Sequence, residues 1–507
     1  MKRWLAFGLA LAGMAPLHAA TSDYDAAFEQ TMARYRLPGL AVGVIDHGKV
    51  VYTRTAGELA AGSGHKIDRD TLFKIASNSK AMTAALLARL VDEGKLRWDD
   101  PVTKYLPAFR MADPWVTAHM QVRDLLVHHS GLGEGAGDLM LWPEPNRFTR
   151  GDIIAGLAYL KPKYEFRAGY AYDNLLYVVA GEVAAAAGGA PYDVLLRREV
   201  FEPLGLARCQ VGAWKRDAVG NVAQPHDARA TVIDADGENV PDIVSAAAGG
   251  VRCSLDDMLA WAKTWVAPDR GQTAWLSTVQ REAVWAPQTP MPISARRRAW
   301  DRTQSYAYAL GWRLADVDGQ WTVSHTGTLS GMYSSLTLLP QCQAGFVVLI
   351  NADAEDARSA LSEALLKTFT DPGQGHTVEA YAKLIDEETK ATAHTHGPDT
   401  SDRTPVTPGE LATRTGQWRD AWFGDVSLCA DGKRVRFASL KSPRLSGTVV
   451  RSHHRYMVAW DHGNTDAWLS WTEGAQPAMR LAKVDPKADF SDDFEDLEFH
   501  RRGACAP

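Results

Sequence analysis

Ser77 and Lys80 are the first residues in this sequence whose types and spacing could do chemistry. They stand three positions apart near the start of residues 73–94 (FKIASNSKAMTAALLARLVDEG), where apolar residues recur every three or four positions and predict a helix. Residues three apart share one helix face, so the amine lies beside the hydroxyl. A serine hydroxyl needs an adjacent base to act as a nucleophile, and a lysine can serve when burial and nearby charge lower its pKa. The pair therefore indicates nucleophilic catalysis by Ser77.

The same Ser-x-x-Lys pattern also occurs at Ser63 and Lys66. This second pair lies in a glycine-rich stretch (AAGSGHKID) with no helix to fix its geometry. About two such matches are expected by chance in a chain of this length, given average residue usage. We interpret Ser63/Lys66 as a chance match, and the pair Ser77/Lys80 needs support from other motifs.

Two further motifs supply that support. Tyr172-Asp173-Asn174 is the only Tyr-x-Asn in the chain, and His325-Thr326-Gly327 is the only His/Lys-Thr-Gly. The glycine allows another backbone to approach closely. We expect the Asp173 side chain to face solvent. The three motifs in this order are far more specific than any one of them.

The elements that must position these residues form an α+β pattern. Strands are predicted near both ends of residues 21–370, with helices between them. The first two, residues 40–45 and 50–55, flank the hairpin signal DHGK. We therefore expect an α+β fold whose sheet is built from distant chain ends, with helices in the middle of the chain. The later elements are strands at residues 306–312, 321–325, 334–339 and 346–350 and a helix at 356–369.

A second body is predicted at the C-terminal end. Residues 371–408 comprise a helix at 378–392 and a polar linker (AHTHGPDTSDRTPVTP). Residues 409–507 contain short apolar runs at turn-like spacing, which predict a small all-β barrel or sandwich. We expect the five tryptophans in this part to fill its core, with a ligand platform as the alternative. The predicted strands lie near residues 427–428, 435–437, 448–450, 456–460, 467–471 and 479–484.

Residues 1–20 have the pattern of a secretory signal peptide. Lys2 and Arg3 precede an apolar run of about 14 residues that is too short to span a bilayer, and small residues follow. We expect a periplasmic or secreted protein with no stable membrane span after cleavage. Disulfides are then permitted. The sequence cannot fix their connectivity, and five free thiols are the alternative; the first pairs to test are Cys209–Cys253 and Cys429–Cys505, since each stays within one proposed domain.

Composition excludes several other classes of protein. The 507 residues carry a formal net charge of −6 and are 46% hydrophobic, which argues against a disordered chain, a collagen and a polytopic membrane protein. No basic excess indicates a nucleic-acid partner. Neither His128-His129 nor His394-Thr395-His396 with Asp399 makes a persuasive metal site, so we expect no metal and no cofactor.

The three motifs together resemble those of the serine β-lactamase and penicillin-binding-protein superfamily, in its class C β-lactamase/DD-peptidase-like branch. The resemblance covers roughly residues 25–370. It implies an antiparallel sheet flanked by helices, with an all-helical insertion that carries the Tyr-x-Asn motif. The C-terminal part resembles a β-barrel-like accessory domain, most clearly in FSDDFEDLEFHR at residues 490–501. Further similar segments are GKLRWDDPVTKYLPAF, DLLVHHSGL, YDNLLYVVAG, AGGVRCSLDDM and YALGW.

The resemblance implies a role for each catalytic position. Ser77 would attack a carbonyl and form an acyl-enzyme. Lys80 would be its general base or lower its pKa, and Tyr172 would relay a proton to the leaving group and later activate water. The backbone N–H groups of Ser77 and Thr328 would form the oxyanion hole.

The resemblance also implies substrate-binding positions. Asn174 would bind the substrate amide and orient Lys80, and His325 with Thr326 and Gly327 would line the opposite wall, near any substrate carboxylate. His128 would lie in a structural turn. Many β-lactamases carry lysine where His325 stands, and an unperturbed histidine is mostly neutral at pH 7.

These roles lead to an expected function with open alternatives. We expect a serine hydrolase that acts on a D-amino-acid-containing peptide or amide, or on a small ester, with cell-wall peptide a possible partner. One alternative is a β-lactamase that uses the same mechanism. The other is a non-catalytic protein that binds peptidoglycan or another partner, with the barrel as a binding module for wall polymer.

Overall fold

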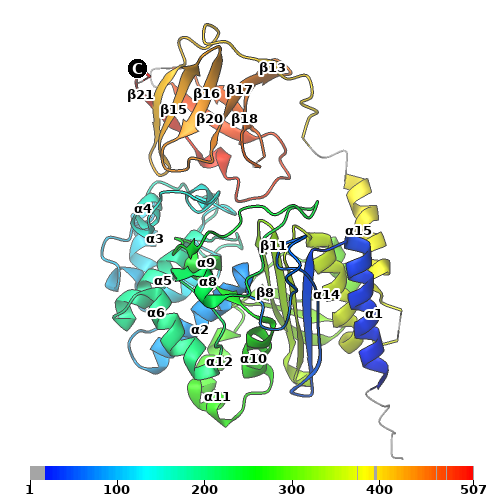
Figure 1. Cartoon of the computed structure of the whole chain (residues 1–507). Helices are drawn as coiled ribbons and strands as arrows, with labels where there is room; N and C mark the ends of the chain where they lie inside the picture. The colour runs from blue at the N-terminus through cyan, green and yellow to red at the C-terminus, as the bar shows by residue number, and fades with distance from the viewer. Residues whose placement is uncertain (1–17, 374, 393–396, 464, 475–476, 506–507) are drawn as a thin grey trace, which may run out of the picture.

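An eight-stranded antiparallel sheet forms the centre of the first 370 residues (Figure 1). The computed structural model describes residues 18–505 except 374, 393–396, 464 and 475–476. The strand order is β2-β1-β12-β11-β10-β9-β8-β7. The strands are β1 Gly39–Asp46, β2 Lys49–Gly57, β7 Thr289–Pro290, β8 Tyr306–Tyr308, β9 Arg313–Val317, β10 Gln320–Leu329, β11 Met332–Leu339 and β12 Ala344–Ile350.

The sheet joins the two ends of this part of the chain, as the sequence predicts. β1 and β2 form the expected hairpin, with His47 and Gly48 at positive φ in its turn. β1 also pairs with β12, so that Leu40 lies opposite Ile350. All seven residues of β12 are buried, which suits a strand paired on both sides and covered on both faces.

Helices cover both faces of this sheet (Figure 1). One face carries α14 with α1 and α15 packed beside it, and the other carries α10 and the helical part around α2 and α5. The predicted helices at 356–369 and 378–392 correspond to α14 and α15. The longer helices are α1 His18–Tyr35, α2 Ser79–Asp92, α5 Leu175–Gly188, α10 Leu255–Val266, α14 Glu355–Thr370 and α15 Val378–Thr392.

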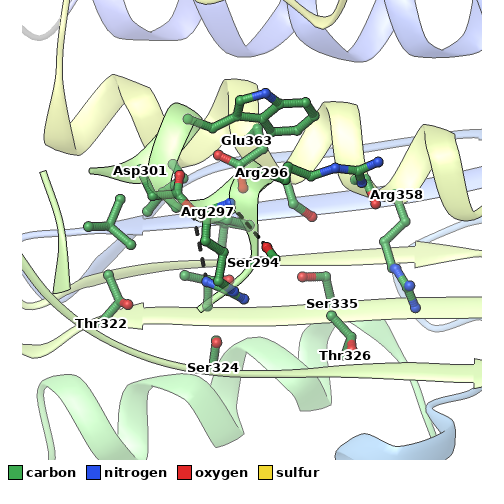
Figure 2. A pocket seen from close by; sticks show the side chains of 17 residues that line it. Ser294, Arg296, Arg297, Asp301, Thr322, Ser324, Thr326, Ser335, Arg358 and Glu363 are labelled. Carbon is green, nitrogen blue, oxygen red and sulfur yellow. Dashed lines mark hydrogen bonds and ion pairs between the residues drawn. The ribbon is translucent and has the colours of Figure 1, made fainter. Parts of the chain in front are cut away.

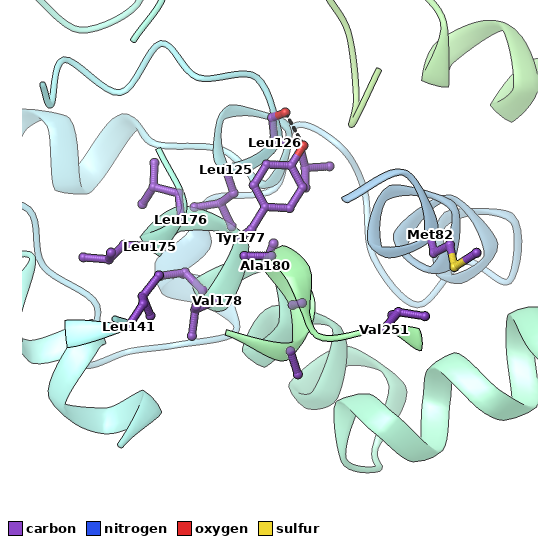
Figure 3. Close-up of a cluster of buried hydrophobic side chains, with 14 of the residues drawn as sticks. Met82, Leu125, Leu126, Leu141, Leu175, Leu176, Tyr177, Val178, Ala180 and Val251 are labelled. Carbon is purple, nitrogen blue, oxygen red and sulfur yellow. Dashed lines mark hydrogen bonds between the residues drawn. The ribbon is translucent and has the colours of Figure 1, made fainter. Parts of the chain in front are cut away.

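The helical part is built around α5, which is buried from Leu175 to Gly181 (Figure 3). The Tyr177 hydroxyl donates a 2.7 Å hydrogen bond to the carbonyl of Leu126, which satisfies the one polar atom of a fully buried ring. Within the described residues, no single helix is long and apolar enough to cross a membrane, and one bent pair that includes α5 passes by length and composition alone.

The C-terminal part is a closed eight-stranded barrel (Figure 1). β17 pairs with both β16 and β18, which closes the ring, and β13 adds to β17 from outside. The strands are β13 Thr404–Pro405, β14 Gly416–Asp420, β15 Gly424–Asp431, β16 Arg434–Ser439, β17 Ser446–Ser452, β18 Arg455–Trp460, β19 Ala467–Trp471, β20 Ala478–Lys483 and β21 Phe499–Gly503.

The barrel tryptophans pack as the sequence predicts. Trp418, Trp422 and Trp468 are buried, and Trp460 and Trp471 pack against the core while partly exposed. Both predicted disulfides are present, and Cys429–Cys505 ties β15 to the chain after β21. Cys342 is a free thiol. The alternative of five free thiols is wrong.

Two sequence predictions fall largely outside the described residues. Most of the signal peptide at residues 1–20 lies there, and α1 begins at His18. The histidine pair of the linker, His394 and His396, also lies there. The signal peptide and the domain boundaries at 370 and 409 stay predictions.

Candidate active site

Ser77 lies in a tight turn that joins a short strand to a helix. The turn, η1 (Ala76–Asn78), follows β3 (Phe73–Lys74) and leads directly into α2. Ala76 has a φ of 48°, a left-handed conformation that a residue with a side chain rarely adopts and that recurs at functional sites. The turn therefore presents Ser77 at the N-terminal end of the helix, where the helix dipole favours developing negative charge.

Gly327 of the His-Thr-Gly motif allows β10 to pack against this turn. A Cβ at Gly327 would overlap the carbonyl oxygen of Ile75 and the hydroxyl of Ser334. The Ser334 hydroxyl itself donates to Ile75 and accepts from the Asn78 amide, each at 2.8 Å. Gly327 thus acts through close packing beside Ser77.

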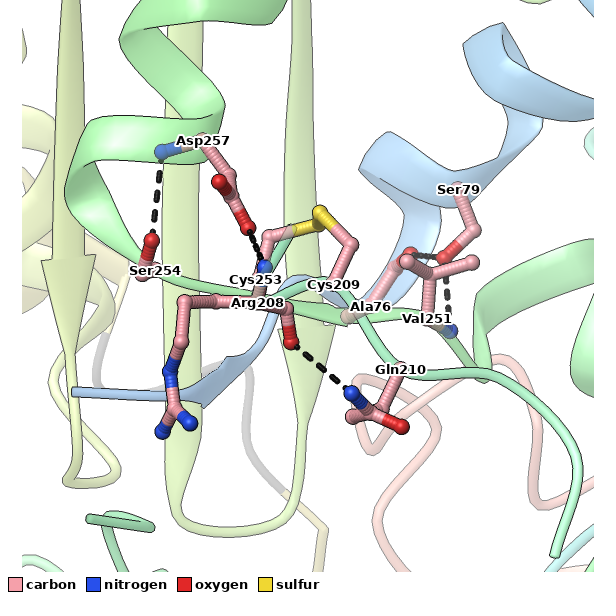
Figure 4. The surroundings of a disulfide bond; sticks show 9 residues. All are labelled: Ala76, Ser79, Arg208, Cys209, Gln210, Val251, Cys253, Ser254 and Asp257. Carbon is pink, nitrogen blue, oxygen red and sulfur yellow. Dashed lines mark hydrogen bonds between the residues drawn. A yellow bond between two sulfur atoms is a disulfide. The ribbon is translucent and has the colours of Figure 1, made fainter. Parts of the chain in front are cut away.

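The Cys209–Cys253 disulfide lies beside the same turn (Figure 4). Cys253 belongs to β6 (Arg252–Cys253), which pairs with β3, so that Phe73 lies opposite Cys253. Next along the chain, the Ser79 hydroxyl accepts from the backbone N–H of Val251 at 3.1 Å and donates to Ala76 at 2.7 Å. The segments on both sides of Ser77 are therefore fixed.

Lys80 lies fully buried against Ser77. Its Nζ is 3.2 Å from Ser77 Oγ, 2.7 Å from Asn174 Oδ1 and 2.8 Å from the carbonyl oxygen of Ala248. Burial lowers the pKa of Lys80 to about 7, so a large fraction of the amine is neutral near pH 7. A neutral amine has two N–H groups and one lone pair. The amide and carbonyl oxygens only accept, so they take both N–H groups and leave the lone pair to the Ser77 hydroxyl.

Tyr172 lies against both Ser77 and Lys80. Its side chain interacts with that of Ser77, and its ring centroid lies 4.8 Å from Lys80 Nζ. Burial raises the pKa of Tyr172 to about 12, so the phenol keeps its proton at neutral pH and can donate it. Ser77, Lys80 and Tyr172 are thus brought together as the sequence predicts.

Asn174 connects Lys80 to a buried carboxyl group that the sequence analysis missed. While Oδ1 accepts from Lys80, Nδ2 donates to Asp138 Oδ2 at 2.8 Å, which fixes the orientation of the amide. Burial raises the pKa of Asp138 to about 8. Asp138 sits in the glycine-rich stretch GEGAGD, and no spacing relative to Tyr172 points to it.

The prediction that Asp173 faces solvent is wrong. Its side chain is buried, accepts from the Ser130 hydroxyl at 3.1 Å and accepts from the backbone N–H of Leu176 at 3.2 Å. Because the Tyr-x-Asn turn leads directly into α5, a carboxylate here satisfies an N–H of the first helical turn. Burial raises the pKa of Asp173 to about 6.

His128 supports this turn and has no metal-binding geometry. Its Nδ1 accepts from the backbone N–H of Asp173 at 3.1 Å, and its ring lies 4.2 Å from that of Tyr172. Burial lowers the pKa of His128 well below its usual range, so the ring is neutral. Next to it, His129 pairs with Asp124 at 2.8 Å. Within the described residues, no group of three or more His, Cys, Asp and Glu side chains could hold a metal ion.

His325 does not line the catalytic wall. Its Nδ1 donates to the Thr326 carbonyl at 2.7 Å, and its Nε2 accepts from the Tyr308 hydroxyl at 2.8 Å. Burial lowers its pKa well below its usual range. A cavity of about 1160 Å³ is lined by Thr326 and Thr328 but not by His325. His325 therefore supports Thr326 from behind as a neutral ring.

The cation that faces the cavity is Arg313, which the sequence analysis also missed. It begins β9, lines the cavity and donates to Thr326 Oγ1 at 2.7 Å. Its Nε has no hydrogen-bond partner among the described residues. The signal that could have found it is the Asp318-Gly319 turn, since a hairpin there places Arg313 opposite Ser324, next to His325.

Ser77, Tyr172, Asn174 and Thr328 line this same cavity, together with residues of the barrel. The Thr328 hydroxyl accepts from Arg358 at 2.8 Å. A second cavity of about 210 Å³ lies between β10, β11 and the helices α13 (Ala295–Asp301) and α14 (Figure 2). Thr326 borders both cavities, but only the first contains Ser77.

Comparisons with known proteins agree with this geometry. A model of the beta-lactamase family matches residues 24–369. The unguisins hydrolase of Aspergillus campestris is 27% identical over 364 residues, which cover 69% of this chain and 64% of that protein, so just under two thirds of the relative is matched. The D-alanyl-D-alanine-carboxypeptidase/endopeptidase AmpH of Escherichia coli K12 is 25% identical over 376 residues, 69% of this chain and 91% of that protein.

A solved structure shares the fold of nearly the whole chain. The octameric penicillin-binding protein homologue from Pyrococcus abyssi matches with a TM-score of 0.59 and 18% identity, over 95% of this chain and 100% of that chain. The matched family model spans the sheet and the helical part that carry the three motifs. The chain belongs to the beta-lactamase family, within the β-lactamase and penicillin-binding-protein superfamily.

Proposed function

We propose that the protein hydrolyses its substrate through an acyl-enzyme on Ser77. The observation that carries the proposal is the contact of Ser77 with the buried amine of Lys80, whose pKa is lowered to about 7. The protonated phenol of Tyr172 lies beside the same serine, and both Ser77 and Tyr172 line the cavity. A weak nucleophile, a base that adjoins it and a proton donor are the parts that acyl transfer needs.

The proposed acylation step moves one proton and exchanges one bond. Lys80 accepts the Ser77 proton while Oγ attacks the substrate carbonyl, and the backbone N–H groups of Ser77 and Thr328 bind the oxyanion. The bond to the leaving group then breaks, Tyr172 passes its proton to the departing nitrogen or oxygen, and Lys80 passes the former Ser77 proton to Tyr172, so that the net transfer is one proton from Ser77 to the leaving group. In deacylation, water attacks the ester, gives its proton to the same pair and releases Ser77 as the hydroxyl.

Arg313 supports a substrate with a carboxylate near the scissile bond. It is a permanent cation on the cavity wall beside Thr326, so its guanidinium attracts an anionic group in the cavity. The proposed substrates are a peptide or amide that contains a D-amino acid, or a small ester. The name of the Escherichia coli relative supports the peptide, and cell-wall peptide is the partner that combines a D-residue with a free carboxylate.

The proposed location is the periplasm or the exterior of the cell. The two disulfides support this location, because disulfide bonds persist in oxidising compartments. The signal-peptide pattern of residues 1–20 points the same way. Fractionation of cells that express the full chain, with cytoplasmic and periplasmic marker enzymes, tests the location.

A four-substrate panel tests the activity. Turnover is measured on a D-Ala-D-Ala peptide, a D-amino-acid amide, a p-nitrophenyl ester and the lactam nitrocefin. We expect turnover of the peptide, the amide or the ester. An Arg313→Met variant, compared at a pH well above the Lys80 pKa so that Lys80 is neutral in both proteins, loses about tenfold in kcat/KM on a carboxylate-bearing peptide but not on the neutral ester. Nitrocefin as the best substrate would favour the β-lactamase alternative. No acylation by any of the four would overturn the proposal.

A further inference from the structure

A loop of the barrel lies over the catalytic cavity. Residues 485–493, here called the barrel loop, connect β20 to the short turn η8 (Phe494–Asp496). Residues 486–492 line the same cavity as Ser77. The Phe490 ring packs edge-on against the Tyr172 ring, with 5.8 Å between the centroids. The barrel therefore contacts a residue of the proposed proton relay directly.

A chain of three hydrogen bonds leads from this loop to the proposed base. The Ser491 hydroxyl donates to Asp138 Oδ2 at 2.8 Å, the same oxygen accepts from Asn174 Nδ2 at 2.8 Å, and Asn174 Oδ1 accepts from Lys80 Nζ at 2.7 Å. Asp138 is fully buried, and its Oδ1 has no hydrogen-bond partner in the described part of the chain. Its anchoring therefore depends on the two bonds at Oδ2.

The catalytic part of the chain is shaped to receive the barrel loop. Gly135 has a φ of 68°, and a Cβ there would lie 2.6 Å from the Phe490 carbonyl oxygen. Gly137 has a φ of 77°, and its N–H donates to Asp493 Oδ2 at 2.7 Å. Glycine thus permits the backbone conformation at both positions, and at Gly135 it also permits the close approach of the loop.

Other contacts hold the barrel in this place. Lys163 pairs with Asp496 at 3.0 Å, Lys441 with Asp152 at 2.6 Å, and Arg444 with Asp234 at 2.5 Å. The Phe148 ring also packs against that of Phe423. Each contact joins the barrel to the helical part, so the loop does not rest on Asp138 alone.

We infer that the C-terminal barrel completes the active site, with Ser491 as a positioning residue that holds Lys80 through Asp138 and Asn174. This inference rests on the proposed acylation of Ser77. Loss of the Ser491 hydroxyl loosens the amide that orients Lys80, so the acylation rate constant falls while substrate affinity stays the same. The barrel is then a part of the catalytic machinery, and not only a binding module for wall polymer.

The first test compares three serine variants of the full chain. Acylation is followed with a p-nitrophenyl ester and with a fluorophosphonate. Ser491→Ala slows acylation about tenfold with unchanged KM, whereas Ser491→Thr, which keeps the hydroxyl, stays within about threefold of wild type. Ser470→Ala, on an exposed position of β19, acylates at the wild-type rate. A wild-type rate in Ser491→Ala would overturn the inference while leaving the proposed function intact.

The second test compares two glycines of equal φ. Gly135 and Gly205 both have a φ of 68°, but a Cβ at Gly205 meets nothing within 4 Å. Gly135→Ala displaces the barrel loop, which raises hydrogen–deuterium exchange at residues 485–493 and slows acylation. Gly205→Ala carries the same backbone strain and changes neither. Unchanged exchange and acylation in Gly135→Ala would overturn the inference. If the wild type itself does not acylate, the proposed function fails, and the exchange experiment still shows whether the loop docks at Gly135.

Discussion

The two Ser-x-x-Lys pairs of this chain have the same sequence pattern and opposite surroundings. Ser63 and Lys66 lie exposed in a loop, and Lys66 forms an ion pair with Glu58 at 2.8 Å. Ser77 and Lys80 lie at the start of α2, where the lysine is fully buried and has only oxygen acceptors around its nitrogen. Water and a carboxylate surround the first lysine, whereas burial lowers the pKa of the second to about 7 and lets it act as a base.

The difference shows that the surroundings and not the motif create the chemistry. The carbonyl of Ala248 and the amide of Asn174 come from segments 168 and 94 positions away from Lys80. These oxygens direct the lysine lone pair to Ser77. In contrast, the partner of Lys66 is Glu58, which is only eight positions away in the same loop.

The largest expected effect separates the two serines. Ser77→Ala removes the attacking oxygen, so kcat/KM on a p-nitrophenyl ester falls by on the order of 10⁴-fold or more, while Ser63→Ala leaves it unchanged. Steady-state kinetics measure both variants, and circular dichroism verifies that each is folded. Comparable losses of kcat/KM in the two variants would show that Ser77 is not the distinct nucleophile.

The two lysines should differ nearly as much. Lys80→Met removes the base and lowers the acylation rate by roughly 10²–10⁴-fold, the range typical of general-base catalysis. Lys66→Met removes a cation that only pairs with Glu58 and leaves the rate unchanged. Stopped-flow acylation of the two variants measures the difference, and a fast Lys80→Met enzyme would show that another group is the base.

The pH dependence tests the buried state of Lys80. Below a pKa of about 7 the amine is protonated and cannot accept the Ser77 proton, so kcat/KM on a neutral ester falls about tenfold per pH unit as the pH decreases. Asp138 and Asp173 hold this pKa up, and Arg313 lowers it further. Asp173→Asn therefore moves the acid limb to lower pH. An acid limb near the ordinary lysine pKa of 10.5 would contradict the burial argument.

The two disulfides give the smallest expected difference in activity. Replacing Cys209 and Cys253 by alanine lowers the free energy of unfolding by about 2–5 kcal/mol and, because β6 adjoins the turn of Ser77, reduces turnover several-fold. Replacing Cys429 and Cys505 destabilises the barrel by a similar amount but leaves turnover unchanged while the protein is folded. Urea unfolding and ester kinetics measure the two effects. Equal turnover in both double variants would show that β6 does not position Ser77.

Much of the fold follows from local patterns in the sequence. The hairpin of β1 and β2 has a turn signal, α14 and α15 have helical spacing, and the barrel strands β15 to β20 have short apolar runs at the predicted places. β9 was missed because it is short and follows the predicted strand at 306–312 without a break in pattern. Arg313, its first residue, was missed with it.

The residues of the candidate site could be predicted where a sequence motif marks them. They could not be predicted where burial by distant segments determines the role of a side chain. Ser77, Lys80 and Tyr172 come together as expected. Asp173 and His325 carry polar side chains whose burial depends on distant segments, and periodicity does not reveal such contacts. The Ser491–Asp138 bond joins residues 353 positions apart, so only the docked barrel shows it.

The most direct test of the account is to map the covalent label. The wild-type chain is treated with a fluorophosphonate and digested with trypsin, which places Ser77 in the peptide of residues 75–80 and Ser63 in that of residues 55–66. We expect one label per chain, on Ser77, and none in the Ser77→Ala variant. A label on the Ser63 peptide, or labelling that survives in folded Ser77→Ala, would contradict it.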